Sequence, residues 1–208
     1  MAQHPDEVEE ITSVCGGFVI NMGNIEEGLV QAMLRAGKKN NEIGHPVVLD
    51  PVGAGAAKKR NDVLFELLDN VKFSVIRGNI SEIKFIATGN SASKGVDADE
   101  SDKVTDKNID SVVEFAKNLS KKTGAVIAIS GETDIIADSE TAYIIKNGHA
   151  VMSKVTGTGC MLSSVMGVFA ASNKENILEA CAVAPALSTS STSSTSFLPL
   201  SHVLSVTA

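Results

Sequence analysis

Short runs of apolar residues alternate along the chain with longer segments in which apolar positions recur at helical spacing. The runs GFVINM (17–22) and PVVLD (46–50) are short, apolar and rich in β-branched residues, which is typical of buried strands. Between them, IEEGLVQAMLRAGKKN has a helical pattern and ends in cations that suit a helix C-terminus. Further strands are predicted for 73–79, 125–130, 134–138 and 142–148, and further helices for about 60–70, 81–88, 107–121, 158–171 and 174–184. The alternation predicts an α/β protein with a mainly parallel central sheet flanked by helices.

Two segments depart from this alternation. Residues 134–148 have the pattern of an antiparallel hairpin, with DSE at its turn. The Ser/Thr run at 188–196 is of low complexity and cannot bury a core face. We therefore expect one domain over residues 1–184, followed by a Ser/Thr-rich tail over 185–208 that is disordered or poorly packed.

Composition narrows the classes of partner. The 208 residues can form one sizeable core, and a formal charge of −7, no Trp and a single Tyr argue against a nucleic-acid binder. The negative net charge does not exclude a small phosphorylated ligand, because binding such a ligand needs only local cations and backbone amides. No apolar run approaches the roughly 20 residues that span a bilayer, and the acidic start MAQHPDEVEE is not a secretory signal. The three cysteines, Cys15, Cys160 and Cys181, are odd in number and widely spaced, which suits a reducing cytosol. With the charge and the apolar runs, this leads us to expect a cytoplasmic protein with no membrane or nucleic-acid partner.

Polar motifs follow four of the predicted strands. NMGN follows the first strand, DPVGAG the second, RGNISE the third and SGETD the fourth. In doubly wound sheets, ligands bind at the C-terminal ends of the strands. We therefore expect these motifs to form one composite site.

The turn TGTGC (156–160) directly precedes a predicted helix. Gly157 and Gly159 permit positive φ and let a phosphate approach the backbone closely. The helix that starts around Thr158 offers unpaired N–H groups and the positive end of its dipole. The same position would favour the thiolate form of Cys160. The alternative is a glycine-rich capping turn with a buried, inert cysteine.

Two motifs carry carboxylates that suit a magnesium site. Asp50 ends the second strand and could hold Mg²⁺ directly or through water, although Asp-Pro-Val-Gly is also an ordinary turn. Asn79 and Glu82 are three residues apart, so a helix starting near Ile80 would place both near its N-terminus, where they suit a hydrated cation and phosphate. The same spacing also fits a variant of the capping box.

Two further strand ends carry groups that suit phosphate. Arg77 could pair with a nucleotide phosphate or be an ordinary surface residue, and the hydroxyl of Ser130 could meet a phosphate. No Walker A sequence, HExxH motif or Ser-His-Asp order is present.

Taken together and in order, these motifs closely resemble the hydroxyethylthiazole kinases, which are ribokinase-like enzymes of thiamine salvage. The resemblance covers roughly residues 1–184 and rests on the joint occurrence of DPVG, RGNISEI, SGE and TGTGC. It implies a three-layer ribokinase-like fold, incomplete here at both ends. It also implies ATP-dependent phosphorylation of the primary alcohol of hydroxyethylthiazole, with Mg²⁺, by a homotrimer whose active sites lie at subunit contacts.

The resemblance also implies roles for individual residues. Arg77, Ser130 and Asn79 are expected to bind ATP, while Gly157 and Met1 contact the substrate. The amides of residues 157–160 are expected to form the anion hole for the transferring phosphoryl group. Glu82 and Asp50 are the expected magnesium residues. Cys160 occupies the position where most ribokinase-like kinases have an aspartate that acts as the general base.

This chain departs from the family pattern at both ends. Family members carry a further strand before the segment that resembles MAQHPDEVEE, and they continue past the last predicted helix without a Ser/Thr-rich run. A catalytically impaired remnant that keeps the phosphate loops is therefore the alternative function. A kinase of another alcohol is disfavoured by Cys160, because those enzymes usually have an aspartate there.

Overall fold

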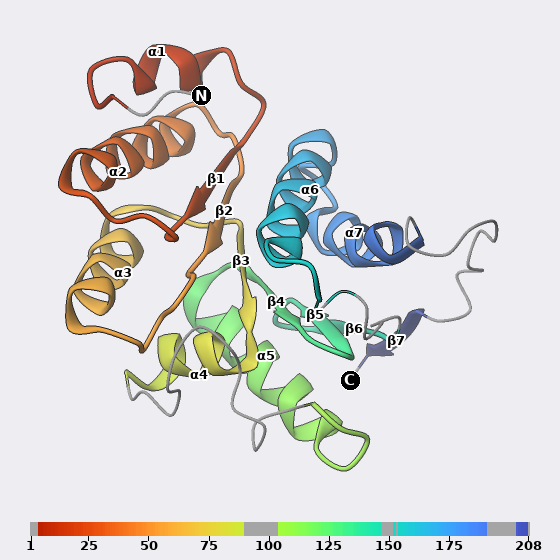
Figure 1. The fold of residues 1–208 in the computed structure, drawn as a ribbon. Helices are drawn as coiled ribbons and strands as arrows, with labels where there is room; N and C mark the ends of the chain where they lie inside the picture. The colour runs from red at the N-terminus through yellow and green to blue at the C-terminus, as the bar shows by residue number, and fades with distance from the viewer. Residues whose placement is uncertain (1–3, 90–103, 147–151, 153, 191–202, 208) are drawn as a thin grey trace.

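The computed structural model describes residues 4–89, 104–146, 152, 154–190 and 203–207 (Figure 1). Its strands are β1 (Phe18–Asn21), β2 (Val47–Asp50), β3 (Val75–Asn79), β4 (Val126–Ser130), β5 (Asp134–Ala137), β6 (Thr141–Ile145) and β7 (Val203–Thr207). Its helices are α1 (Val8–Ser13), α2 (Glu27–Glu42), α3 (Lys58–Asn70), α4 (Ile80–Thr88), α5 (Ile109–Thr123), α6 (Thr158–Ser172) and α7 (Ile177–Ser190). None of the described helices is long and apolar enough to cross a membrane.

The strands form one sheet in which spatial order follows chain order, from β1 to β7. The pairs from β1 to β4 are parallel, whereas those from β4 to β7 are antiparallel. Because β1 to β4 run in the same direction, their C-terminal residues share one edge of the sheet. The register places Asn21 opposite Asp50 and Asn79 opposite Ser130 at that edge.

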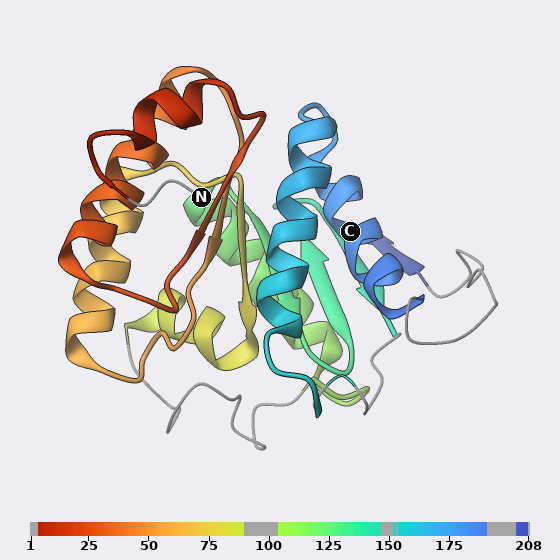
Figure 2. The same ribbon diagram turned by 45° about the horizontal axis from the view of Figure 1, so that its top comes forward.

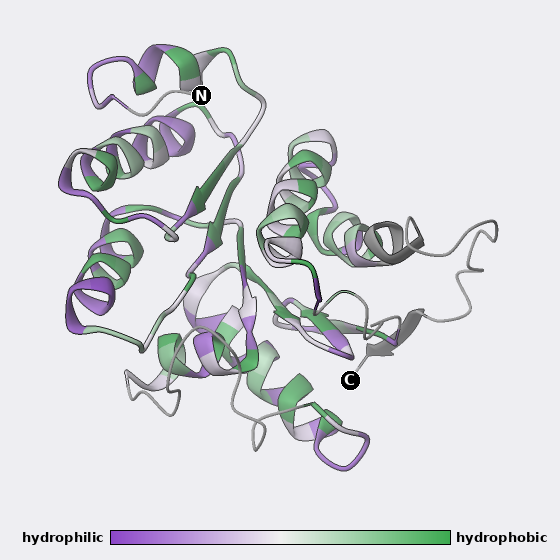
Figure 3. Ribbon diagram, viewed as in Figure 1, coloured by the Kyte–Doolittle hydropathy of each residue, from purple (hydrophilic) through white to green (hydrophobic). Residues whose placement is uncertain are grey.

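Helices cover both faces of the sheet. The helices from α2 to α5 lie on one face and α6 and α7 on the other, while α1 packs on α2 (Figures 1 and 2). Neighbouring strand residues point to opposite faces, so Leu49 joins the core under α2 to α5 and Val48 joins the core under α6 and α7. In Figure 3, β1 and β2 are coloured as mainly hydrophobic, whereas hydrophobic and hydrophilic residues alternate along α2 and α3. This pattern is what strands buried on both faces and half-exposed helices require.

Most of the predicted elements are confirmed, with boundaries that agree to within a few residues. The α/β class, the helical layers and the hairpin over β5 and β6 are as expected, although the sheet is mixed because every pair beyond β4 is antiparallel. The short helix α1 was not predicted.

The C-terminal segment differs from the expectation of an unpacked tail. Helix α7 continues to Ser190, with Pro185 inside it, and Val203–Thr207 pairs with β6 as strand β7. The sequence VLSVT is rich in β-branched residues, which explains why it can extend the sheet. Residues 191–202 lie outside the described part, and the division at residue 184 stays a prediction.

Candidate active site

Asp50 lies at the centre of the edge formed by the C-terminal ends of β1 to β4. The residue is 1% exposed. Its Oδ2 atom accepts hydrogen bonds from Asn21 Nδ2 at 3.0 Å and from Ser163 Oγ at 2.8 Å, and it lies 3.8 Å from Arg77 Nη1. Burial raises the pKa of Asp50, while the Arg77 guanidinium and hydrogen bonds from Ser163, Asn21 and the Cys160 thiol oppose that rise. Asp50 is thus a buried carboxylate surrounded by donors.

Arg77 is buried rather than an ordinary surface residue. It is 8% exposed, and its Nη2 atom donates to Ser130 Oγ at 2.5 Å. Ser130 Oγ also lies 3.4 Å from the Gly78 carbonyl oxygen, to which it can donate. The Nε atom of Arg77 is buried and has no hydrogen-bond partner among the described residues. Leaving a buried donor unmatched costs free energy.

Gly159 brings the first turn of α6 against this arginine. A Cβ atom at position 159 would lie 2.8 Å from Arg77 Nη1 and 3.1 Å from Nη2. From the sequence, the expected role of this glycine is to allow a phosphate to approach the backbone. In the structure, the group that occupies this space is the guanidinium that we expect to bind phosphate.

Glu82 ties two of the polar loops together. Its Oε1 atom accepts the Gly53 N–H at 2.9 Å, and its Oε2 atom accepts the Asn79 N–H at 2.9 Å. The Asn79 side chain in turn accepts the Glu82 N–H at 2.9 Å, which completes a capping box at the start of α4. Burial raises the pKa of Glu82, and the two backbone N–H groups oppose this. The capping role is therefore confirmed, while the role toward magnesium stays a prediction.

The TGTGC turn begins α6 as the sequence predicts. Gly157 is the N-cap residue at φ +90° and supplies no side-chain cap, so the first amides of the helix, from Thr158 to Cys160, have no intrahelical acceptor. Cys160 is exposed, which contradicts the alternative of a buried, inert cysteine. Its thiol nevertheless reaches the Asp50 carboxylate.

The structure brings together at one edge all the predicted site residues that it describes, namely Asp50, Arg77, Asn79, Glu82, Ser130, Gly157, Thr158, Gly159 and Cys160. Their roles toward ligands stay predictions. Met1 lies outside the described residues.

Four residues at this edge were missed by the sequence reasoning. Asn21 and Ser163 bind Asp50, and Arg60 Nη1 donates to the Met22 and Val52 carbonyl oxygens, which links the loops after β1 and β2. Asp134 is buried at the start of β5 and accepts the Gly131 N–H at 2.8 Å. Asn21 and Asp134 stood inside motifs that the sequence singled out, NMGN and SGETD. Arg60 and Ser163 lie within helices and gave no signal.

Asp134 has the most perturbed carboxyl group of this edge. Burial raises its pKa to about 6, and the hydrogen bond from Gly131 and the field of Arg77 oppose the rise.

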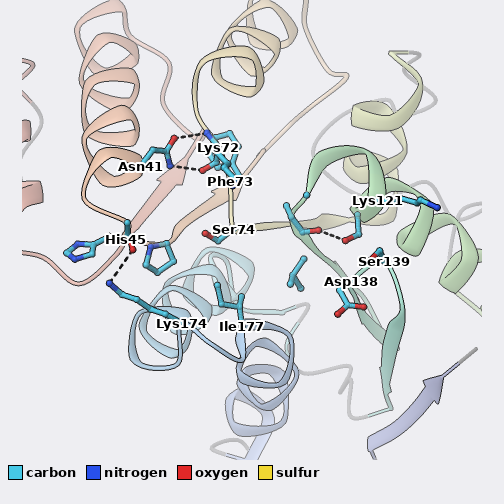
Figure 4. A pocket seen from close by; sticks show the side chains of 16 residues that line it. Asn41, His45, Lys72, Phe73, Ser74, Lys121, Asp138, Ser139, Lys174 and Ile177 are labelled. Carbon is cyan, nitrogen blue, oxygen red and sulfur yellow. Dashed lines mark hydrogen bonds between the residues drawn. The ribbon is translucent and has the colours of Figure 1, made fainter.

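A cavity of about 550 Å³ lies at the opposite end of the sheet, where β2, β3 and β4 begin (Figure 4). His45, Lys72, Lys121 and Lys174 line it, and Lys174 Nζ donates to the Gly44 carbonyl oxygen at 3.4 Å. The lysines lie near the C-terminal ends of helices, where cations offset the helix dipole. Their positions are therefore explained without a ligand.

The type and number of acidic residues at this edge can be compared with what magnesium takes in proteins. Among the described residues, no group of three or more His, Cys, Asp or Glu side chains could hold a metal. Magnesium commonly takes one or two carboxylates and completes its shell with water and phosphate oxygens. Asp50 and Glu82 supply that number of carboxylates.

Comparison with known proteins identifies the family. A model of the hydroxyethylthiazole kinase family matches residues 1–198. The hydroxyethylthiazole kinase of Clostridium acetobutylicum is 55% identical over 180 residues, which are 86% of this chain and 66% of that protein. The hydroxyethylthiazole kinase of Clostridium beijerinckii is 46% identical over 180 residues, which are 86% of this chain and 64% of that protein. The chain thus spans about two thirds of the length of these relatives.

Solved structures agree with this result. The hydroxyethylthiazole kinase protein from Pyrococcus horikoshii has a TM-score of 0.75 and 30% identity, covering 88% of this chain and 65% of that one. A ribokinase-like superfamily protein from Enterococcus faecalis, at 13% identity and a TM-score of 0.59, matches in fold alone, over 88% of this chain and 56% of its own. The family match, the close relatives and the ribokinase-like fold lead to one conclusion: the chain belongs to the hydroxyethylthiazole kinase family.

Proposed function

We propose that this protein transfers a phosphoryl group from ATP to the primary alcohol of hydroxyethylthiazole, as a step of thiamine salvage. The observation that carries the proposal is the convergence of Asp50, Arg77 and the uncapped start of α6 at one edge of the sheet. Phosphoryl transfer depends on positioning and charge neutralisation more than on covalent chemistry. A buried cation, free backbone amides and a carboxylate at one edge are the groups that such a reaction uses.

The nucleotide would bind where donors lack partners. Arg77 would bind a phosphate through its guanidinium, whose buried Nε has no acceptor among the described residues. Ser130 is held at the end of β4 by Arg77 and can donate its hydroxyl hydrogen to a phosphate oxygen. The free amides of α6, from Thr158 to Cys160, would surround the transferring phosphoryl group as an anion hole.

Magnesium would be held by Asp50 and Glu82. The two Glu82 oxygen atoms each accept a backbone N–H, so this carboxylate would hold water of the hydrated ion. Apart from the Cys160 thiol, no described residue donates a hydrogen bond to Asp50 Oδ1, so this atom can face the ion. When bound with ATP, magnesium neutralises the charge of the phosphate oxygens. Asn79 would keep Glu82 in place through the capping box.

Cys160 would orient the substrate hydroxyl and, in its thiolate form, accept the hydroxyl proton at Sγ. The thiol is exposed at the first turn of α6 and reaches Asp50. A loose transition state demands little base strength. We therefore expect Cys160→Ala to lower kcat without abolishing turnover. Gly157 would contact the substrate at the same turn, and Met1 is the second substrate contact that the family resemblance implies.

We propose further that the working assembly is a cytosolic homotrimer, on the strength of the family resemblance. The free cysteines of the described chain, Cys15, Cys160 and Cys181, suit a reducing compartment. Light scattering coupled to size-exclusion chromatography measures the assembly.

Steady-state release of ADP in the presence of hydroxyethylthiazole and MgATP tests the function. We expect alcohol-dependent turnover that falls in Cys160→Ala and is unchanged in Cys15→Ala, a matched control at another exposed cysteine. Folded protein that binds ATP and releases no ADP with the alcohol would identify a remnant and overturn the proposal.

A further inference from the structure

The hydrogen bonds to Asp50 are concentrated on one of its two oxygen atoms. Asn21 Nδ2 and Ser163 Oγ both donate to Oδ2, and the nearby Arg77 nitrogen also lies against Oδ2. Apart from the Cys160 thiol, no described residue donates a hydrogen bond to the other oxygen, Oδ1, and this atom is not among their buried unpartnered atoms. The carboxylate is thus fixed on one side and open on the other.

Ser163 is the more deeply placed of the two donors. It is 0% exposed and lies on α6, three residues after Cys160. Its hydroxyl also lies 3.4 Å from the Gly159 carbonyl oxygen, but the contact with Asp50 is shorter at 2.8 Å. Hydrogen bonds to an ionised acceptor are the stronger kind, so the hydroxyl hydrogen belongs to Asp50. This bond joins the start of α6 to the end of β2.

Asn21 is itself held in a single orientation. Its Oδ1 atom accepts the Gly23 N–H at 2.8 Å, and its Nδ2 atom donates to Asp50. The parallel register places Asn21 directly opposite Asp50. Because both ends of the amide are used, the side chain cannot flip without losing both bonds.

We propose that Ser163 and Asn21 are positioning residues for Asp50, which hold Oδ2 so that Oδ1 faces the magnesium and phosphate groups of the substrate complex. This inference rests on the proposed function. Neither residue touches the reacting atoms, so both act through Asp50. Partners that orient a metal-binding carboxylate typically contribute about 10–100-fold to metal affinity or activity.

The test compares Ser163→Ala with Ser164→Ala. Ser164 is the adjacent, exposed serine of α6, and its hydroxyl bonds to the Cys160 carbonyl oxygen at 3.1 Å instead of to Asp50. Isothermal titration calorimetry measures the Kd of ATP with Mg²⁺ and again in EDTA. The ratio of the two Kd values reports how much the metal adds to binding, and steady-state kinetics report kcat and KM.

We expect Ser163→Ala to reduce the metal-dependent ratio and kcat by about tenfold or more, with the Kd measured in EDTA nearly unchanged. Ser164→Ala should keep both values within about twofold of the wild type. Ser163→Thr, which keeps the hydroxyl, should restore most of the loss. A merely structural serine would lower stability without moving the ratio, and that result would overturn the inference.

Variants of Asn21 provide a second, independent test, which can be used even if Ser163→Ala does not fold. Asn21→Ala should lower the same ratio, whereas Asn24→Ala, which removes a comparable loop bond to the Glu26 N–H, should not. Equal effects of the two asparagine variants would contradict the inference. If the wild-type protein turns over the alcohol but each variant has the same Kd ratio and kcat as its control, the inference is overturned and the proposed function stands. A wild type that binds no ATP overturns the proposed function and the inference together.

Discussion

Replacing Asp134 with Asn should change how the stability of the fold depends on pH. Burial raises the pKa of this carboxyl from 3.8 to about 6, and the residue is 7% exposed. A raised pKa means that the folded state favours the protonated form. The stabilisation is therefore full below the unfolded value of 3.8 and is lost as the pH rises through about 6.

The magnitude follows from the size of the shift. A shift of about 2 pH units corresponds to about 3 kcal/mol, of which about 2 kcal/mol is lost between about pH 4.5 and 7.5. The side-chain amide introduced by Asp134→Asn would keep an acceptor for the Gly131 N–H but could not ionise. The free energy of unfolding of Asp134→Asn, relative to the wild type, should therefore rise by about 2 kcal/mol over this range, whatever the packing cost of the amide.

Urea unfolding followed by far-UV circular dichroism measures this difference, because the chain has no Trp to serve as a fluorescent probe. Asp138→Asn is the matched control. Asp138 accepts the Glu140 and Thr141 N–H groups at the turn between β5 and β6, and its variant controls for replacing a carboxylate with an amide at the other end of β5. If Asp134→Asn shows the same pH dependence as the wild type, the reasoning is refuted.

Three further substitutions test other contacts. Gly159→Ala would place a Cβ 2.8 Å from Arg77 Nη1, so the guanidinium should move and the KM for ATP should rise about tenfold; unchanged kinetics would show that Arg77 adapts freely. Glu82→Gln leaves only one side-chain acceptor for two backbone N–H groups, so urea unfolding should show a loss of about 1–2 kcal/mol, and an equally stable variant would contradict the capping box. Gly167→Ala would place a Cβ 2.6 Å from Val19 Cγ2, where α6 crosses β1, and should cost about 1–3 kcal/mol in the same assay unless the helix can shift.

The strands and the edge that carries the site were predictable because their signals are local. A continuous apolar run predicts a buried strand, and a polar motif after a parallel strand lies at the shared C-terminal edge. Asp50, Arg77, Asn79 and Ser130 all lie at or near the ends of such runs. Their convergence therefore followed from topology alone.

The missing features depend on contacts between distant segments. Ser163 lies inside an apolar helix, and its bond to Asp50 joins positions 113 residues apart. Arg60 lies on α3 but bonds to loops after β1 and β2. Strand β7 was missed because the composition of the preceding Ser/Thr run, rather than the pattern of VLSVT, dominated the interpretation.

Transfer of a phosphoryl group to an alcohol at this edge of the sheet is the step on which the proposed function stands or falls. To detect it, the purified protein is incubated with γ-labelled ATP, Mg²⁺ and hydroxyethylthiazole, and the labelled product is identified by chromatography and ³¹P NMR. We expect label on the primary alcohol of the thiazole, in an amount that falls when Cys160 is replaced by Ala. Label found only in inorganic phosphate, or in no product at all while the protein is folded and binds ATP, would show that this edge does not phosphorylate the alcohol.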